Sequence, residues 1–118
     1  MPPFNQTVDI GHANGARFQR IIAQVDPASF YSMMPAAVLT MLGVESQWTW
    51  VFQLADGSQV QRHLAEIGIK LEGQQRTTVC VFGEPQSEPV LGKHTLDAFG
   101  LDVDETNQRL VAAQFGLG

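Results

Sequence analysis

The sequence predicts an all-β fold, a small closed or nearly closed sheet of about seven to nine short strands with two short helices. Runs of β-branched and aromatic residues recur along the chain, and turns rich in Gly, Asp and Asn separate them. Only two segments carry helix signals, and each is about two turns long. With 118 residues, the chain is expected to form one domain over residues 1–118.

In the first half, Gly11 to Gly15 is a dense turn signal that should fold the first strand back onto the second. A short helix over residues 36–42 follows Pro35 and should end at Gly43. The alternation of apolar residues changes register near Ala65, which predicts a bulge or bend. The strands expected in this half cover residues 4–10, 17–25, 48–54 and 59–71.

In the second half, residues 72–75 and the loop over residues 83–89 should connect further strands. A second short helix over residues 93–99 should end at Gly100. The last two strands should flank a polar turn over residues 105–108. The strands expected here cover residues 76–82, 90–92, 101–104 and 109–111.

Composition excludes several classes of protein. The chain is 44% hydrophobic and 16% charged, with a net charge of −5 and scattered Lys and Arg, so neither a disordered protein nor a nucleic-acid binder is expected. No apolar run is long enough for a membrane helix and no signal peptide is evident, which favours a cytoplasmic location without membrane association. The single cysteine, Cys80, should be a buried strand residue. No cofactor is expected, and His12, His63 and His94 lack the spacing of a metal site.

One position stands out as a candidate site. An apolar strand ending at Val25 delivers the carboxylate of Asp26, and the chain then turns through Pro27, Ala28 and Ser29 into another apolar run. A carboxylate fixed at the end of a strand by a small-residue turn is accessible to a substrate. Without further context, such an Asp more often caps its own turn.

Two stretches in this order resemble the retropepsin family of aspartic peptidases, in particular its bacterial single-domain branch. The family's Val-Asp-Thr-Gly-Ala strand end, short strand, Pro and helical turn compare with VDPASFYSMMP followed by AAVLTMLGV. Its apolar strand, loop, Leu-Gly-Arg and short helix compare with TTVCVFGEPQSEPVLGKHTLDAFGLDVD, the more specific match. Between them, WVFQLADGSQVQRHL lies where the family has a flap hairpin. The resemblance covers roughly residues 7–111.

The resemblance implies a barrel-like acid-protease fold and an aspartic endopeptidase that acts as a homodimer. Each subunit would supply one Asp26, so that an ionised carboxylate activates water while its protonated partner polarises the scissile carbonyl. A peptide or protein substrate would bind as an extended strand beneath two flaps. The flap would comprise Leu54, Ala55, Asp56, Gly57 and Ser58, and the supporting element Leu91, Gly92 and Lys93.

The chain departs from the family pattern at two places. Pro27 and Ala28 replace the Thr and Gly of Asp-Thr-Gly, which removes a hydroxyl and an N–H that join the two subunits in the family. Lys93 replaces an Arg whose acidic partner would be at the position of Phe30. A catalytically impaired dimer of the same fold, serving as a peptide-binding or structural module, is therefore the alternative function.

Several other residues are weaker candidates for a functional role. Asp9-Ile10-Gly11 also spells Asp-x-Gly, but it is interpreted as part of a hairpin turn. Trp48 and Trp50 should lie on one face of a strand, where Trp50 or Phe52 could cover a substrate. Ser29 and Ser32 have no evident His and Asp partners for a serine hydrolase. The role of residues 112–118, free or interleaved with a partner, stays open.

Overall fold

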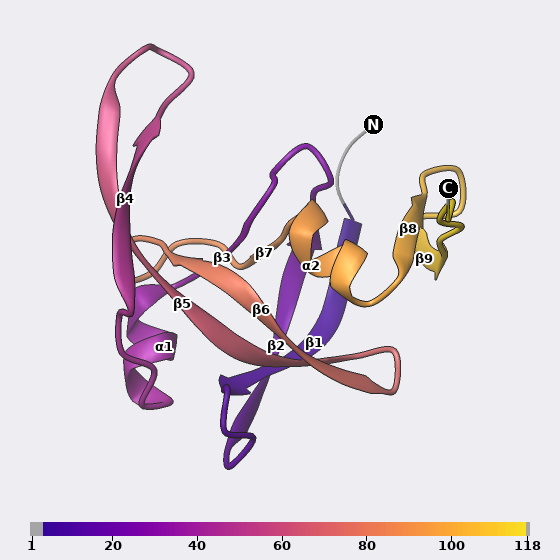
Figure 1. Ribbon diagram of the computed structural model, residues 1–118, viewed down its shortest axis with the longest axis horizontal. Coiled ribbons are helices and arrows are strands. Elements are labelled where there is room, and N and C mark those ends of the chain that lie inside the picture. The colour runs from indigo at the N-terminus through magenta and orange to yellow at the C-terminus, as the bar shows by residue number, and fades with distance from the viewer. Residues whose placement is uncertain (1–3, 118) are drawn as a thin grey trace.

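The computed structural model describes residues 4–117. Its elements are nearly all strands, joined by short turns, with two helices of about one and a half turns each (Figure 1). In chain order they are β1 (Phe4–His12), β2 (Phe18–Val25), β3 (Ser32–Met34), α1 (Ala36–Met41), β4 (Trp48–Gln53), β5 (Gln59–Leu71), β6 (Gln74–Phe82), β7 (Val90–Leu91), α2 (Lys93–Ala98), β8 (Leu101–Asp104) and β9 (Arg109–Ala112).

The main sheet closes on itself. Its strand order is β1-β2-β7-β3-β6-β5-β4, and an additional pairing between β1 and β5 joins the two sides into a ring that leaves β4 outside. Closure removes most free sheet edges and encloses a core of apolar side chains. The expected all-β, barrel-like fold with two short helices is therefore confirmed. Fully buried members of this core include Ile10, Met34, Leu39, Ile67, Ile69 and Leu91.

A short β-ribbon follows the closed sheet. Strands β8 and β9 pair only with each other, and Leu101, Val103 and Leu110 pack against the core. Beyond β9, the N–H of Ala113 donates to the carbonyl of Gly100, whereas Phe115 and Leu117 are exposed. Of the segment 112–118 considered above, Gly118 lies outside the described residues.

The Asp-x-Gly segment near the N-terminus was wrongly placed in a turn. Asp9 and Gly11 lie within β1, where they pair with β2 on one side and β5 on the other. Gly11 is required there because a Cβ would lie 2.0 Å from the carbonyl oxygen of Arg17. The turn starts after His12, with the N–H of Gly15 donating to the His12 carbonyl.

Of the bulge or bend expected near Ala65, the bulge is absent from the described pairings. Strand β5 keeps one unbroken register with β4 and another with β6. The apolar pattern changes because β5 changes its surroundings: Ile67 and Ile69 face the barrel core, whereas Val60 and Arg62 lie in the hairpin with β4. That hairpin projects away from the barrel (Figure 1). Neither helix within residues 4–117 has the length and apolar character needed to cross a membrane.

Candidate functional site

Asp26 directly follows β2 and is held by its own turn. One carboxylate oxygen, Oδ1, accepts the N–H of Ala28 at 3.0 Å, and Oδ2 accepts the hydroxyl of Ser29 at 3.3 Å. The Ser29 N–H also donates to the Asp26 carbonyl, which closes the turn. The side chain is half-buried. These contacts are those of an Asp that caps a turn, and they also give the carboxylate a fixed orientation.

The Leu91-Gly92-Lys93 segment lies against this turn. Leu91 is fully buried in β7, which pairs in parallel with β2, and its carbonyl accepts the Asp26 N–H at 3.0 Å. The N–H of Lys93 donates to the Ser29 carbonyl at 2.8 Å. The two segments singled out in the sequence are thus in direct contact, although more than 60 residues separate them.

Gly92 allows this close contact. Its backbone is extended, so no conformational reason demands glycine, but an added Cβ would lie 2.5 Å from the carbonyl carbon and oxygen of Tyr31. Those neighbours are backbone atoms, which cannot rotate away. Gly92 also donates its N–H to the Ser32 hydroxyl at 3.0 Å. The size of this one residue determines how closely α2 approaches the Asp26 turn.

A buried polar cluster beneath the turn was not anticipated from the sequence. The hydroxyls of Ser32, Thr78 and Thr95 are linked through Thr95, and all three residues are buried. They join β3, β6 and α2 under the Asp26 turn. Hydroxyl residues in apolar runs were the only available signal, because Ser32 and Thr95 are far apart in the chain. Buried polar groups that are fully paired make such a support rigid.

The residues expected at the flap form the tip of the β4–β5 hairpin. Leu54 and Ser58 are joined by a backbone hydrogen bond of 2.7 Å, and Gly57 has a φ of 86°, which favours glycine. The hydroxyl and N–H of Ser58 both donate to Asp56 and lower the pKa of that exposed carboxyl. Ala55 is exposed between them. The tip is therefore a well-defined tight turn on a projecting hairpin.

A groove of about 520 Å³ lies between this hairpin and the Asp26 turn. Ser29, the hydroxyl donor to Asp26, lines it on one side, and Phe52 and Leu54 line it on the other. Most of its remaining wall is apolar. The groove residues are Ser29, Phe30, Tyr31, Met33, Phe52, Gln53, Leu54, Val60, Arg62, Val81 and Val90.

Aromatic side chains connect the turn to the hairpin. Phe30 and Tyr31 pack edge to face with ring centroids 4.7 Å apart, and both contact the ring of His94. Tyr31 reaches Trp50, and Trp50 lies between Trp48 and Phe52 along β4. The one-face arrangement predicted for the two tryptophans is therefore confirmed.

Lys93 makes a local ion pair within α2. Its Nζ lies 3.0 Å from the Asp97 carboxylate, one turn along α2, and both side chains are largely exposed. The position expected to carry the acidic partner is Phe30, which packs on His94. The Phe30 side chain therefore contributes aromatic packing beside the Asp26 turn.

The other candidate residues lie away from the groove or are inaccessible. His12 lies at the end of β1, and His63 contacts Ser46. Within the described residues, no cluster of three His, Cys, Asp or Glu side chains is placed to hold a metal ion. Cys80 is fully buried, as expected, and burial raises the pKa of its thiol to about 12.

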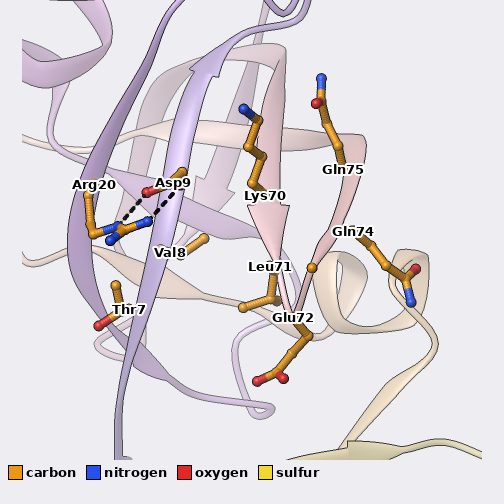
Figure 2. Close-up of a pocket in the computed structure, with 10 residues that line it drawn as sticks. Thr7, Val8, Asp9, Arg20, Lys70, Leu71, Glu72, Gln74 and Gln75 are labelled. Carbon is orange, nitrogen blue, oxygen red and sulfur yellow. Dashed lines mark hydrogen bonds and ion pairs between the residues drawn. The ribbon is translucent and has the colours of Figure 1, made fainter.

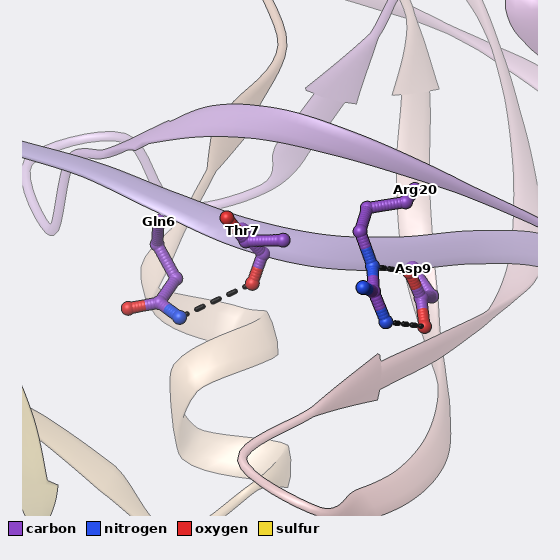
Figure 3. A network of polar contacts seen from close by, with 4 residues as sticks. All are labelled: Gln6, Thr7, Asp9 and Arg20. Atoms are coloured by element: carbon purple, nitrogen blue, oxygen red, sulfur yellow. Dashed lines mark hydrogen bonds and ion pairs between the residues drawn. The ribbon is translucent and has the colours of Figure 1, made fainter.

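A second hollow, of about 400 Å³, lies between β1 and the β5–β6 turn (Figure 2). Its charged side chains are Asp9, Arg20, Lys70 and Glu72. Asp9 and Arg20 form an ion pair at 3.0 Å (Figure 3), which raises the pKa of Arg20. Arg20 is largely exposed, so this pair is weak. Asp26 lies elsewhere, on the turn beside the first groove.

Comparison by sequence yields no match to a protein-family model or to a curated protein. Comparison by structure does yield matches. One is the solution structure of the protease of Simian Foamy Virus (mac), with a TM-score of 0.56 and 14% sequence identity. The match covers 78% of this chain and 92% of the viral one. The chain therefore shares the retropepsin-like fold of that protease.

Proposed function

We propose that the chain is an aspartic-type endopeptidase that acts as a homodimer, in which each subunit contributes one Asp26. The observation that carries this proposal is the place of Asp26. Its carboxylate is oriented by Ala28 and Ser29, and Ser29 lines the groove beneath the β4–β5 hairpin. A peptide lying in that groove would pass beside this carboxylate. The assignment to a bacterial single-domain branch belongs to the same proposal.

The reaction needs two carboxyl groups, and the chain has one such turn. In the proposed dimer, two Asp26 side chains meet at the twofold axis and share one proton, since like charges about 3 Å apart cannot both ionise. The ionised member removes a proton from water, and the protonated member donates to the scissile carbonyl. Exposed apolar side chains at Phe115 and Leu117 are available to a partner.

The turn sequence supports a second candidate, the non-catalytic peptide-binding dimer. Pro27 has no backbone N–H to donate across an interface, and both oxygens of Asp26 already accept hydrogen bonds within the turn. A displacement of about 1 Å in a catalytic group can cost about a hundredfold in rate. In this case, the groove would bind peptides without cleaving them.

The test is cleavage of a denatured polypeptide between pH 4 and 7, with and without a transition-state-mimicking inhibitor of aspartic peptidases. Asp26→Asn keeps the size of the side chain and removes the acid, so cleavage should disappear. Asp9→Asn is the matched control, because Asp9 lies in β1 away from the groove. Cleavage that persists in Asp26→Asn would contradict the proposal, as would a monomer in sedimentation at assay concentration. The cytoplasmic location stays a prediction from the sequence.

A further inference from the structure

The groove contains one charged side chain among its described lining residues, that of Arg62. The others are apolar or aromatic, apart from Ser29 and Gln53. A guanidinium in such surroundings is costly to bury unless an anion accompanies it. The groove therefore combines an apolar wall with a single cation.

Strand alternation directs Arg62 into the groove. On β5, Val60 and Arg62 are half-buried and line the groove, whereas Gln61 and His63 between and beyond them are exposed. His63 contacts Ser46, away from the groove wall. Since side chains on a strand point alternately to opposite faces, Arg62 lies on the inner face of the hairpin. Its direct cross-strand neighbour is Trp50.

The partner of Arg62 within the protein leaves most of its donors free. A terminal guanidinium nitrogen, Nη1, lies 3.0 Å from Oε1 of Glu84, and this is its one polar contact within the described residues. The side chain of Arg62 is 28% exposed, but that of Glu84 is 69% exposed. A guanidinium has five N–H donors in a planar fork that fits a carboxylate at two points. An ion pair with so exposed a partner is weak.

We propose that Arg62 selects peptide substrates that carry an acidic side chain, flanked by apolar residues that occupy the rest of the groove. This inference rests on the proposed function. A substrate carboxylate would take the free donors of Arg62 and either join or displace Glu84. In the proposed dimer each subunit contributes one Arg62, so the charge complementarity is specific to one position in each half of an extended peptide, because neighbouring side chains point to opposite faces. Arg62 is thus a specificity-determining residue, and hydrolysis depends on Asp26.

The experiment uses fluorescence-quenched octapeptides built from Ala, Leu, Val and Phe, in which Glu or Gln is placed at each position in turn. We measure kcat/KM at pH 5.5, where a glutamate side chain is ionised. At one position on each side of the cleaved bond, Glu should be preferred over Gln by about tenfold or more, the size expected for hydrogen bonds to a charged group. Arg62→Gln should abolish this preference, and with peptides that carry Lys at the same position, Arg62→Glu should prefer Lys over Gln.

Two further variants sharpen the result. Arg20→Gln removes the same charge from the second hollow, outside the groove, and should leave the Glu preference unchanged, which controls for net charge. Glu84→Gln removes the competing carboxylate and should increase the preference. Thermal melts establish that each variant is folded. An equal Glu-to-Gln ratio in wild type and Arg62→Gln would overturn the inference and leave the peptidase proposal standing.

Peptide binding tests the role of Arg62 separately from the peptidase proposal when no cleavage occurs. The same Glu and Gln peptides, labelled with a fluorophore, are titrated against Asp26→Asn protein and followed by anisotropy. The Glu peptide should bind more tightly than the Gln peptide, and this difference should disappear in the double variant Asp26→Asn with Arg62→Gln. That result supports the role of Arg62 even if the enzyme is inactive. Equal binding of both peptides overturns that role and leaves peptide binding in the groove standing. Binding of neither peptide overturns both.

Discussion

Replacing Gly92 with Ala tests whether the close contact between α2 and the Asp26 turn determines the site. The new methyl group would lie 2.5 Å from the carbonyl carbon and oxygen of Tyr31 and 2.8 Å from the carbonyl oxygen of Phe30. Both neighbours are backbone, so either the turn or the start of α2 must move. Overpacking of this kind costs about 1–3 kcal/mol.

The displacement also threatens two hydrogen bonds next to the glycine. The N–H groups of Lys93 and His94 donate to the carbonyls of Ser29 and Phe30, both at 2.8 Å. Each hydrogen bond contributes about 1 kcal/mol. Together with the cost of overpacking, their loss should lower the free energy of unfolding of Gly92→Ala by about 3–5 kcal/mol. Small domains have about 5–15 kcal/mol in total, so the loss would be large. If the chain cleaves peptides, activity should fall more than stability alone explains, because the Asp26 turn shifts.

Urea unfolding followed by tryptophan fluorescence measures this change. Gly116→Ala is the control, since nothing lies within 4 Å of its added Cβ, and its midpoint should match wild type. A Gly92→Ala protein within about 0.5 kcal/mol of wild type, the range of ordinary surface substitutions, would refute the packing argument.

Three further predictions concern the turn, its support and the barrel. Ser32→Ala should destabilise the protein by about 1–3 kcal/mol in urea unfolding, because the Gly92 N–H and the Thr95 hydroxyl lose a buried partner; an unchanged midpoint would contradict this. Introducing Thr and Gly together, by Pro27→Thr with Ala28→Gly, should raise kcat/KM by about ten- to a hundredfold if the chain is a peptidase whose rate is limited by misplacement of Asp26; no gain would exclude that cause. Burial raises the pKa of the Cys80 thiol from 9.0 to about 12, so the unfolded chain loses its thiol proton first. The stability present below pH 9 should therefore fall by about 1.4 kcal/mol per pH unit between pH 9 and the folded pKa. Cys80→Ala should remove that part of the slope, and an identical slope in both proteins would show that the thiol is not the cause.

Local sequence patterns were sufficient to place most elements. Strand β5 was predicted with its observed bounds, and the turn at Asp56-Gly57 follows from the positive φ that a tight hairpin requires. Gly43 and Gly100, both at positive φ, were correctly expected to end the two helices. These features depend on a few neighbouring residues, so they can be read without knowledge of the fold.

Errors arose where tertiary contacts outweigh local signals. Gly11 belongs to a turn by composition, yet it lies in a strand because β1 is paired on both sides and passes close to Arg17. The alternation of apolar residues changes near Ala65, and this change resembled a bulge. It arises because β5 leaves the hairpin with β4 there and enters the barrel wall. In both cases the strand partners, which are distant in sequence, determine the conformation.

The sequence by itself determined the strand-rich fold class, the turn that carries Asp26 and the segment that contains Gly92, since each has a local pattern of residue types. Only the tertiary structure decided that Gly92 donates to Ser32, that Thr95 completes a buried cluster beneath the turn, and that Arg62 enters the groove. Ser32 and Thr95 are 63 residues apart. Contacts between residues so far apart in the sequence produce no local pattern of residue types, because they form only when the barrel closes and brings the strands together.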